Sequence, residues 1–149
     1  LRDPAGWRDR AALARLAADA DPTATPAAAL SALSMRMRRV GLDAVPLLTA
    51  ARASHPDNFE LAFALGLAHG GPDRAGRPVG PFEAAAALRP NHLVTRMNLG
   101  VALAARGDLD GAVASFRRAV AIAPANAQAH SNLGSALHAR GKLDDAEAA

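Results

Sequence analysis

The 149-residue chain has no cysteine and no tyrosine, and it contains only one tryptophan and four phenylalanines. Without cysteine it cannot form disulfides, Cys-based zinc sites or a thiol nucleophile. No apolar run reaches the ~18 residues that a transmembrane helix needs, so we expect no membrane partner. A charged segment followed by an apolar core, which would indicate a signal peptide, is not seen either, and we expect a cytoplasmic protein.

Strong charge of one sign is also missing. Lys and Arg number 17 against 14 Asp and Glu, which leaves a net charge of only +3. The densest basic run, formed by Arg36, Arg38 and Arg39, is typical of the solvated end of a helix, where cations interact favourably with the helix dipole. A nucleic-acid-binding protein usually concentrates positive charge on one face or arm. We therefore expect no nucleic-acid partner.

Alanine is what the chain has in abundance, with 40 of the 149 residues. Alanine is the best helix former, whereas the aromatic and β-branched residues that favour strands are scarce. Half of the residues are hydrophobic, which is too many for a disordered polar linker. The composition therefore predicts an all-α protein.

Prolines recur with a fixed spacing of 34 residues, at Pro22, Pro56, Pro90 and Pro124. Further residues repeat with the same spacing, namely Leu65-Gly66, Leu99-Gly100 and Leu133-Gly134, and also Gly107 and Gly141. A constant period of this length indicates a repeat architecture.

Each unit has the pattern of two helices. In residues 93–126 the apolar spacing predicts one helix over 93–105, a turn at Gly107, and a second helix over 109–122 that Pro124 ends. Asp108 or Asp110 can cap the second helix. Gly100 and Ala112 are small, as close crossing of two antiparallel helices requires.

These residues resemble the tetratricopeptide repeat family, in its bacterial type. The matching positions of the strongest unit are Leu99-Gly100, Gly107, Ala112, Phe116, Ala119 and Pro124. The resemblance implies a right-handed α-solenoid of antiparallel helix pairs with about 3.5–4 repeats. The tryptophan and tyrosine common in the first helix of this family are replaced, by Arg96 or His130 and by Leu103 or Leu137.

The 34-residue register divides the chain into five segments. They are a lone second helix in 1–24, a degenerate repeat in 25–58 with Ser31-Ala32 in place of Leu-Gly, a repeat in 59–92, a repeat in 93–126, and a truncated repeat in 127–149. In the third segment a Gly- and Pro-rich loop over 70–80 should precede a short helix, Pro81–Leu88. In the last, a second helix should begin near Lys142.

Weak packing is a further expectation. Because the family's tryptophan and tyrosine are replaced, packing area is lost, and the abundant alanines offset part of this loss through their helix propensity, so the stack should be strongly helical but loosely packed. It should be loosest at 70–80 and at the C-terminal end. The missing N-terminal Met and the incomplete last repeat suggest a piece of a longer protein.

Residues able to carry out catalysis do not form a recognisable set. The five histidines, His55, His69, His92, His130 and His138, lack the spacing of a metal site. Ser131 and Ser135 have no base in the sequence paired with them, and the glycines near residue 70 lack the Lys of a phosphate loop. We expect no enzyme activity, no metal and no cofactor.

The resemblance implies a concave groove lined by the first helices, which in this family binds extended peptides or partner helices. The residues expected there are Phe63, Leu67, Val94, Met97, Asn98, Val101, Gln128, Ser131, Asn132, Ser135 and His138. Asn98 and Asn132 would present amides to a ligand backbone, or they are merely solvated or cap a turn. Met97 and Val101 would contact a ligand, or they pack against a neighbouring helix. The Lys and Arg set of the family's carboxylate-clamp members is missing.

The sequence supports a protein-interaction scaffold that binds a peptide or protein partner, whose identity it does not reveal. An alternative is the non-catalytic regulatory or substrate-docking region of a larger enzyme. Repeats with Asn-Leu-Gly triplets resemble those fused to glycosyltransferases, and similar arrays follow bacterial serine/threonine kinase domains. The open C-terminal end also offers a surface for self-association.

Overall fold

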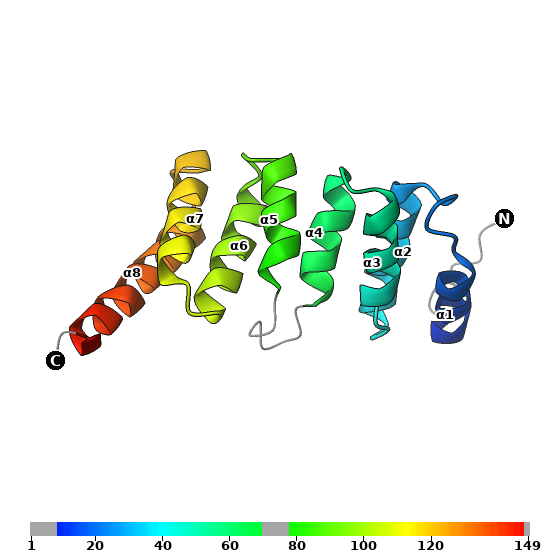
Figure 1. Ribbon diagram of the computed structural model, residues 1–149, viewed down its shortest axis with the longest axis horizontal. Coiled ribbons are helices and arrows are strands. Elements are labelled where there is room, and N and C mark those ends of the chain that lie inside the picture. Colours follow the sequence, from blue (N-terminus) through cyan, green and yellow to red (C-terminus); the bar gives the residue numbers. More distant parts are fainter. Residues whose placement is uncertain (1–8, 70–77, 148–149) are drawn as a thin grey trace. The chain divides into compact units, whose positions relative to one another are not determined.

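The computed structural model describes residues 9–69 and 78–147, with side chains as far as Lys142. Within these ranges every regular element is an α-helix and none is a strand, which confirms the expected all-α class. The chain separates into two units, residues 1–69 and 70–149, and each is described by itself. Figure 1 shows the helices of both units.

The described part of the first unit, residues 9–69, contains four helices. They are α1 (Arg10–Asp19), α2 (Ala27–Arg39), α3 (Val45–Ser54) and α4 (Phe59–Ala68). Helix α2 packs against α1, α3 and α4, and α3 also packs against α4. The buried core of this unit is formed by Leu30, Met37, Ala44, Leu47, Leu48, Ala51, Leu61, Ala64 and Leu65. The basic run Arg36, Arg38 and Arg39 lies exposed in the last turn of α2, as expected.

Residues 78–147, the described part of the second unit, also contain four helices. They are α5 (Val79–Leu88), α6 (Leu93–Ala105), α7 (Leu109–Ile122) and α8 (Ala127–Glu147). Helix α6 packs against α5 and α7, and α8 packs against α7 and, less extensively, against α6. Its core includes Phe82, Ala85, Leu99, Leu103, Ala112, Val113, Phe116 and Ala119. Helix α6 has the bounds predicted from the sequence, and α7 spans the predicted apolar stripe from Leu109 to Ile122.

The connection after each second helix recurs with the 34-residue period. His55, Arg89 and Ala123 end α3, α5 and α7, and each N–H donates to the alanine carbonyl four residues earlier. Three residues further on, Asn58, His92 and Asn126 accept a backbone N–H with their side chains at 3.0, 3.2 and 2.9 Å. Proline follows each helix end and cannot continue it. The N-cap, two residues after the proline, then begins the next helix.

The turn between α6 and α7 depends on Gly107, whose φ is +88°. The N–H of Gly107 donates to Ala104 and the N–H of Asp108 donates to Leu103, both at 3.0 Å. A left-handed residue in this position is strained for any side chain with a Cβ, so glycine is favoured. The Asp108 carboxylate then accepts the N–H of Gly111 at 2.9 Å. Of the two candidate caps, the helix therefore uses Asp108.

The assignment of Ser31-Ala32 to the Leu-Gly position is wrong. Helices α2 and α6 both have 13 residues, and each is followed by a left-handed glycine, Gly41 with φ +73° and Gly107 with φ +88°. These glycines are 66 residues apart (107 minus 41), as are the helix starts, so the equivalent of Leu99-Gly100 is Leu33-Ser34. Ser34 is fully buried and its hydroxyl donates to the carbonyl of Ser31 at 2.7 Å.

The register shifts because the connections in the first unit are longer. Four residues separate Pro22 from the start of α2, whereas two separate Pro90 from α6. The Asp21 side chain accepts the N–H and the hydroxyl of Thr23 in this longer connection, at 2.8 and 2.7 Å. The register returns by the end of α3, which has only 10 residues. A small residue and a turn glycine are therefore kept in the repeat that we expected to be degenerate.

Two helix bounds in the second unit also differ from the sequence prediction. Helix α5 begins at Val79, not at Pro81, because Pro78 takes the N-cap position with an extended backbone and Pro81 lies within the first turn. The loop expected over 70–80 falls mostly outside the described residues.

Helix α8 is the larger departure. It runs for 21 residues through Gly141, where the repeat predicts a turn and a new helix near Lys142. The glycine has no positive φ, unlike Gly107. A turn at Gly141 would break backbone hydrogen bonds of the helix. The turn is favoured only when a following helix packs against α8 and compensates for this loss. Asp144 and Asp145 consequently lie near the end of α8 and not in the first turn of a helix.

The close crossing predicted at Gly100 is present. A Cβ built on Gly100 would lie 2.5 Å from Cε1 of Phe116, and Ala112 of α7 is fully buried. Gly134 occupies the same repeat position in α8, but a Cβ built there meets nothing within 4 Å. The two glycines therefore share a sequence position and differ in packing.

This difference gives a matched pair of variants. Gly100→Ala should lower the free energy of unfolding by about 1–2 kcal/mol, because overpacking against Phe116 exceeds the gain in helix propensity. Gly134→Ala should raise it by about 0.5–1 kcal/mol, because only the propensity gain acts. Urea denaturation followed by circular dichroism measures both. Equal effects of the two variants would contradict the assigned crossing.

Candidate functional site

The expected site residues lie on three helices in two units. Phe63 and Leu67 are half-buried on α4 of the first unit, where the Phe63 ring stacks on Phe59 with ring centroids 5.7 Å apart. The others lie on α6 and α8 of the second unit. Whether Phe63 and Leu67 join them in one surface stays a prediction.

On the second unit, the expected residues of α6 and α8 form a mixed surface. Val94 is 47% exposed, and Met97, Asn98 and Val101 are half-buried. The exposed members on α8 are Gln128, Ser131, Ser135 and His138, while Asn132 is half-buried. The half-buried state of Met97 and Val101 is consistent with either alternative, since part of each side chain faces its own unit and part remains accessible.

The two asparagines have different hydrogen bonds. Nδ2 of Asn98 donates to the carbonyl of Val94 one turn earlier, at 2.8 Å. Asn132 accepts at Oδ1 from Nε2 of Gln128, also at 2.8 Å. The hydroxyl of Ser135 donates to the carbonyl of Ser131 at 2.9 Å. Each polar group is thus held in one rotamer, with hydrogen-bonding capacity remaining on Asn132 and Ser135.

A hollow of about 290 Å³ lies between α6, α7 and α8. We call it the α6/α8 hollow, and its lining residues are Val101, Ala104, Leu109, Phe116, Asn132, Ser135, Ala136 and Ala139. Three of them, Val101, Asn132 and Ser135, are among the residues expected from the sequence.

The other five lining residues were missed by sequence reasoning. Phe116 could have been found, because the Gly100 crossing places its ring beneath α6. Leu109 belongs to the predicted apolar stripe of α7 but is half-buried at one end of it. The three alanines give no signal, since an alanine that leaves space cannot be distinguished by sequence from one that fills it.

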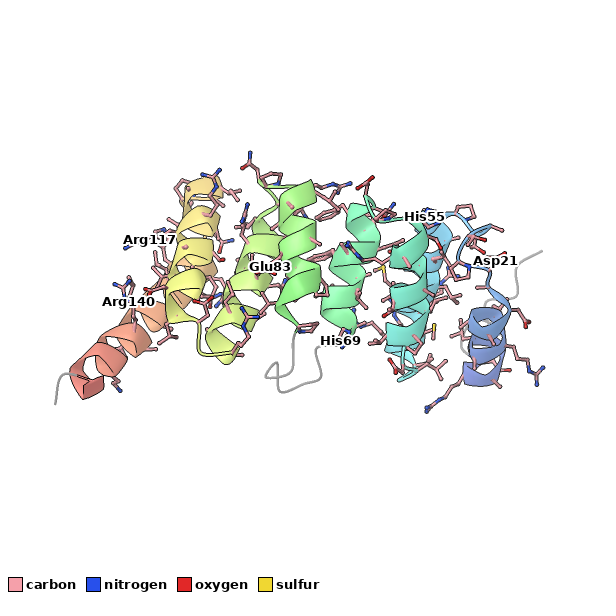
Figure 2. The ribbon with its side chains drawn as sticks, in the orientation of Figure 1. Asp21, His55, His69, Glu83, Arg117 and Arg140 are labelled. Carbon is pink, nitrogen blue, oxygen red and sulfur yellow. The ribbon has the colours of Figure 1, made fainter. Side chains whose placement is uncertain are left out.

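The residues that replace the family's tryptophan make polar contacts. Nε of Arg96 donates to the carbonyl of Pro90 at 2.9 Å, and Nε2 of His130 lies 2.7 Å from the carbonyl of Pro124. In the first unit Nε2 of His55 lies 3.1 Å from the carbonyl of Pro22, and Figure 2 shows His55 near that connection. These side chains thus tie the loop that follows each closing proline to a nearby helix end.

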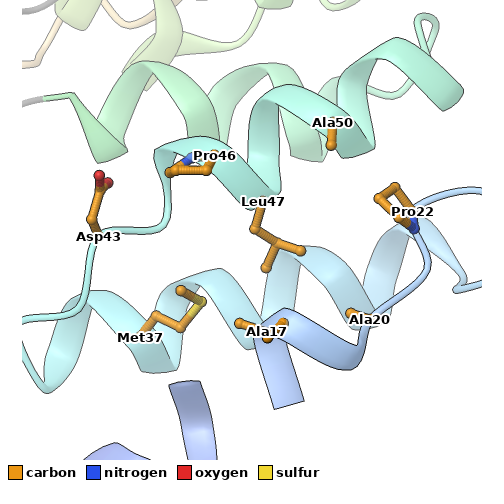
Figure 3. A pocket seen from close by; sticks show the side chains of 9 residues that line it. Ala17, Ala20, Pro22, Met37, Asp43, Pro46, Leu47 and Ala50 are labelled. Carbon is orange, nitrogen blue, oxygen red and sulfur yellow. The ribbon is translucent and has the colours of Figure 1, made fainter. Parts of the chain in front are cut away.

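A second hollow, of about 380 Å³, lies in the first unit between α1, α2 and α3 (Figure 3). Its walls include Ala17 of α1, Ala20 just after α1, Met37 of α2 and Leu47 of α3. Asp43 is its only charged lining residue, and its carboxylate accepts the N–H of Val45 at 2.9 Å. The space results from small side chains on α1, whose one fully buried residue is Leu13.

Charged groups of the described surface are mostly exposed. Arg140 of α8 and Asp110 of α7 form an ion pair at 3.1 Å, with Asp110 at 85% exposure. Hydrogen bonds from the Thr23 side chain and backbone lower the pKa of Asp21, a fully exposed loop residue. Within the described ranges, groups of three potential metal ligands are not found, and the helices are too short or too polar to cross a bilayer.

Comparison with known proteins addresses the repeat directly. Residues 100–141 match a family model described as TPR repeat. Residues 100–141 therefore carry the tetratricopeptide repeat. Its fold matches solved structures of MamA from MSR-1 and from AMB-1, each with a TM-score of 0.73 and 26% identity over 91% of this chain. The match covers 79% and 75% of those proteins.

A mutant of the Thermobaculum terrenum O-GlcNAc transferase is also similar. It is 30% identical over 75% of this chain, with a TM-score of 0.62, but the match covers only 22% of the transferase. Among curated proteins nothing matches significantly. The repeat at residues 100–141 and the match to these structures suggest a protein-interaction scaffold.

The hydrogen bonds of Asn98 and Asn132 lead to a stability prediction. Neither amide caps a helix, so Asn98→Ala and Asn132→Ala should leave the free energy of unfolding unchanged or raise it by up to about 0.5 kcal/mol, since alanine is the better helix former. Thermal unfolding of the two variants measures this. Losses above about 1 kcal/mol would mean that the amides hold the fold together.

Proposed function

We propose that this tetratricopeptide chain is a protein-interaction scaffold that binds an extended peptide segment on the α6–α8 face of its second unit. The observation that carries the proposal is the α6/α8 hollow, at which three residues expected from the sequence, Val101, Asn132 and Ser135, lie together. A concave site with a few convergent polar groups is where a ligand is expected.

The polar groups at the hollow suit a peptide backbone. Oδ1 of Asn132 is engaged by Gln128, which directs Nδ2 elsewhere as a donor. The Ser135 hydroxyl uses its hydrogen on Ser131, so its lone pairs remain as acceptors. A donor and an acceptor on adjacent turns of α8 can bind the C=O and N–H of an extended segment. Lysine and arginine are missing from the lining residues, which disfavours a terminal carboxylate as the main determinant.

Binding to a random peptide library displayed on phage tests the proposal. Peptides enriched on the wild-type chain should bind the Asn98→Ala, Asn132→Ala double variant more weakly by about 1–3 kcal/mol, or roughly 5- to 150-fold in Kd. Isothermal titration calorimetry with an enriched peptide gives this number. Met97→Glu should also weaken binding, because a charge would be desolvated at the interface.

The matched control is Asn91→Ala, at an exposed asparagine in the connection between α5 and α6. It should leave the Kd unchanged. A library that yields no enriched peptide, or an asparagine double variant that binds as the wild type does, would overturn the proposed function.

Self-association through the C-terminal helix is a second candidate function, favoured by one observation. The face of α8 at Gly134 meets nothing within 4 Å, although the equivalent face of α6 at Gly100 is packed against Phe116. A helix from a second copy could occupy that face, and repeat proteins with an exposed end associate in this way.

Light scattering across a concentration series measures this. The wild-type mass should rise with concentration, and Gly134→Arg should hold the chain as a monomer because the larger, charged side chain blocks the face. The control Gly80→Arg places the same change on an exposed glycine of α5. A strictly monomeric wild type would contradict self-association and leave peptide binding unaffected.

The resemblance to part of a transferase supports a third role, as a non-catalytic docking region within a larger enzyme. The matched region is 22% of that transferase, so the rest of it lies outside the similarity. Sequencing the reading frame on both sides of the 149 residues decides this: kinase or transferase motifs would support it, and frames without them would contradict it.

A further inference from the structure

The α6/α8 hollow has a rigid floor. The Phe116 ring is only 3% exposed, and it is fixed by its contact with Gly100, where even a Cβ would lie within 2.5 Å. Ala136 on the α8 wall is 4% exposed. Because floor and wall are packed into the core of the unit, the hollow exists before any ligand binds, and a ligand does not have to open it.

The lining of the hollow is uncharged. Its polar members are Asn132 and Ser135, and the remaining six lining residues are apolar. Asp110 and Arg140, which join α7 to α8, neutralise each other at 3.1 Å and line no part of it. A charged side chain placed in the hollow would lose hydration and gain no counter-ion, whereas an apolar one would lose only contact with water.

The size of the hollow indicates that its ligand is a single side chain and not a larger molecule. Sites for small molecules and cofactors usually span roughly 300–1,000 Å³. The α6/α8 hollow, at about 290 Å³, is at the lower limit of that range and is open on one side. It is too small to enclose most cofactors and large enough for one bulky side chain.

We propose that the α6/α8 hollow is an anchor pocket that binds one large, uncharged apolar side chain of the partner peptide, of the class of leucine, methionine or phenylalanine. This inference rests on the proposed peptide-binding function and names the residue class that the site selects. Asn132 and Ser135, on the α8 side of the hollow, would bind the peptide group next to the anchor, and Phe116 would contact its tip.

The experiment uses minimal probes in place of the unidentified partner. N-acetyl-leucine N-methylamide carries one apolar side chain between two peptide groups, and the corresponding lysine and glutamate compounds are its charged counterparts. Each is titrated into the ¹³C-methyl-labelled chain while the methyl resonances of Val101 and Leu109, both in the lining, are followed by NMR. The methyl groups of Val113, buried in α7 away from the lining, report nonspecific effects.

The variant pair is Ala104→Met and Ala105→Met. Ala104 lines the hollow, and its longer replacement would fill it from the α6 side. Ala105 is the exposed neighbour on the same helix and does not line the hollow. Both changes keep an unbranched, helix-favouring side chain, and circular dichroism establishes that each variant is folded.

The expected result is that the leucine probe shifts the Val101 and Leu109 methyls in the wild type and in Ala105→Met. The shifts should be lost in Ala104→Met, and the lysine and glutamate probes should produce none. Equal shifts from charged probes, no shift from any probe, or shifts that persist in folded Ala104→Met would overturn the anchor pocket.

The two proposals fail separately. If library peptides bind the chain but the leucine probe does not enter the hollow, the anchor pocket is wrong and the scaffold function stands. If no library peptide binds, the scaffold function fails whatever the small probe does.

Discussion

The contact between Gly100 and the Phe116 ring determines how the second unit is built. It allows α6 and α7 to approach until no Cβ would fit between them, and it buries the aromatic side chain almost completely. The same ring forms the floor of the α6/α8 hollow. A single missing side chain on α6 thus sets the helix separation, fills the core and shapes the surface that we propose as a binding site.

The connections that follow α3, α5 and α7 have the same local hydrogen bonds. Each closing proline is preceded by a residue that ends the helix and is followed two residues later by an N-cap, in the order His55 to Asn58, Arg89 to His92 and Ala123 to Asn126. These hydrogen bonds join residues that are three or four apart in the sequence, so they do not depend on contacts with neighbouring repeats. They explain why the period remains readable although the aromatic residues usual in this family are missing.

The sequence predicted the parts of the fold that depend on local signals. Helices α6 and α7, the Gly107 turn and the Gly100 crossing follow from glycine and proline at fixed positions, while the choice of Asp108 over Asp110 as the cap came only from the structure. It was wrong where the outcome depends on what lies elsewhere in space. The turn at Gly141 does not form, and the extra residues after Pro22 shift the Leu-Gly position to Leu33-Ser34. For the candidate site, the polar residues could be predicted from their helical face, whereas the hollow between them could not. An alanine in the sequence does not indicate whether the space around it is filled by neighbouring side chains or left open.

The most direct test of this account is a double-mutant cycle that combines Gly100→Ala with Phe116→Leu. If the cost of the added Cβ comes from the ring, Gly100→Ala should destabilise the wild type but have little or no cost once Phe116 is replaced by the smaller leucine. The two changes would then show a coupling energy of about 1–2 kcal/mol in urea denaturation. For substitutions at distant, independent sites, the changes in the free energy of unfolding add to within about 0.5 kcal/mol. Additive effects of the two substitutions would show that α6 and α7 are not held by this contact, and would contradict the account.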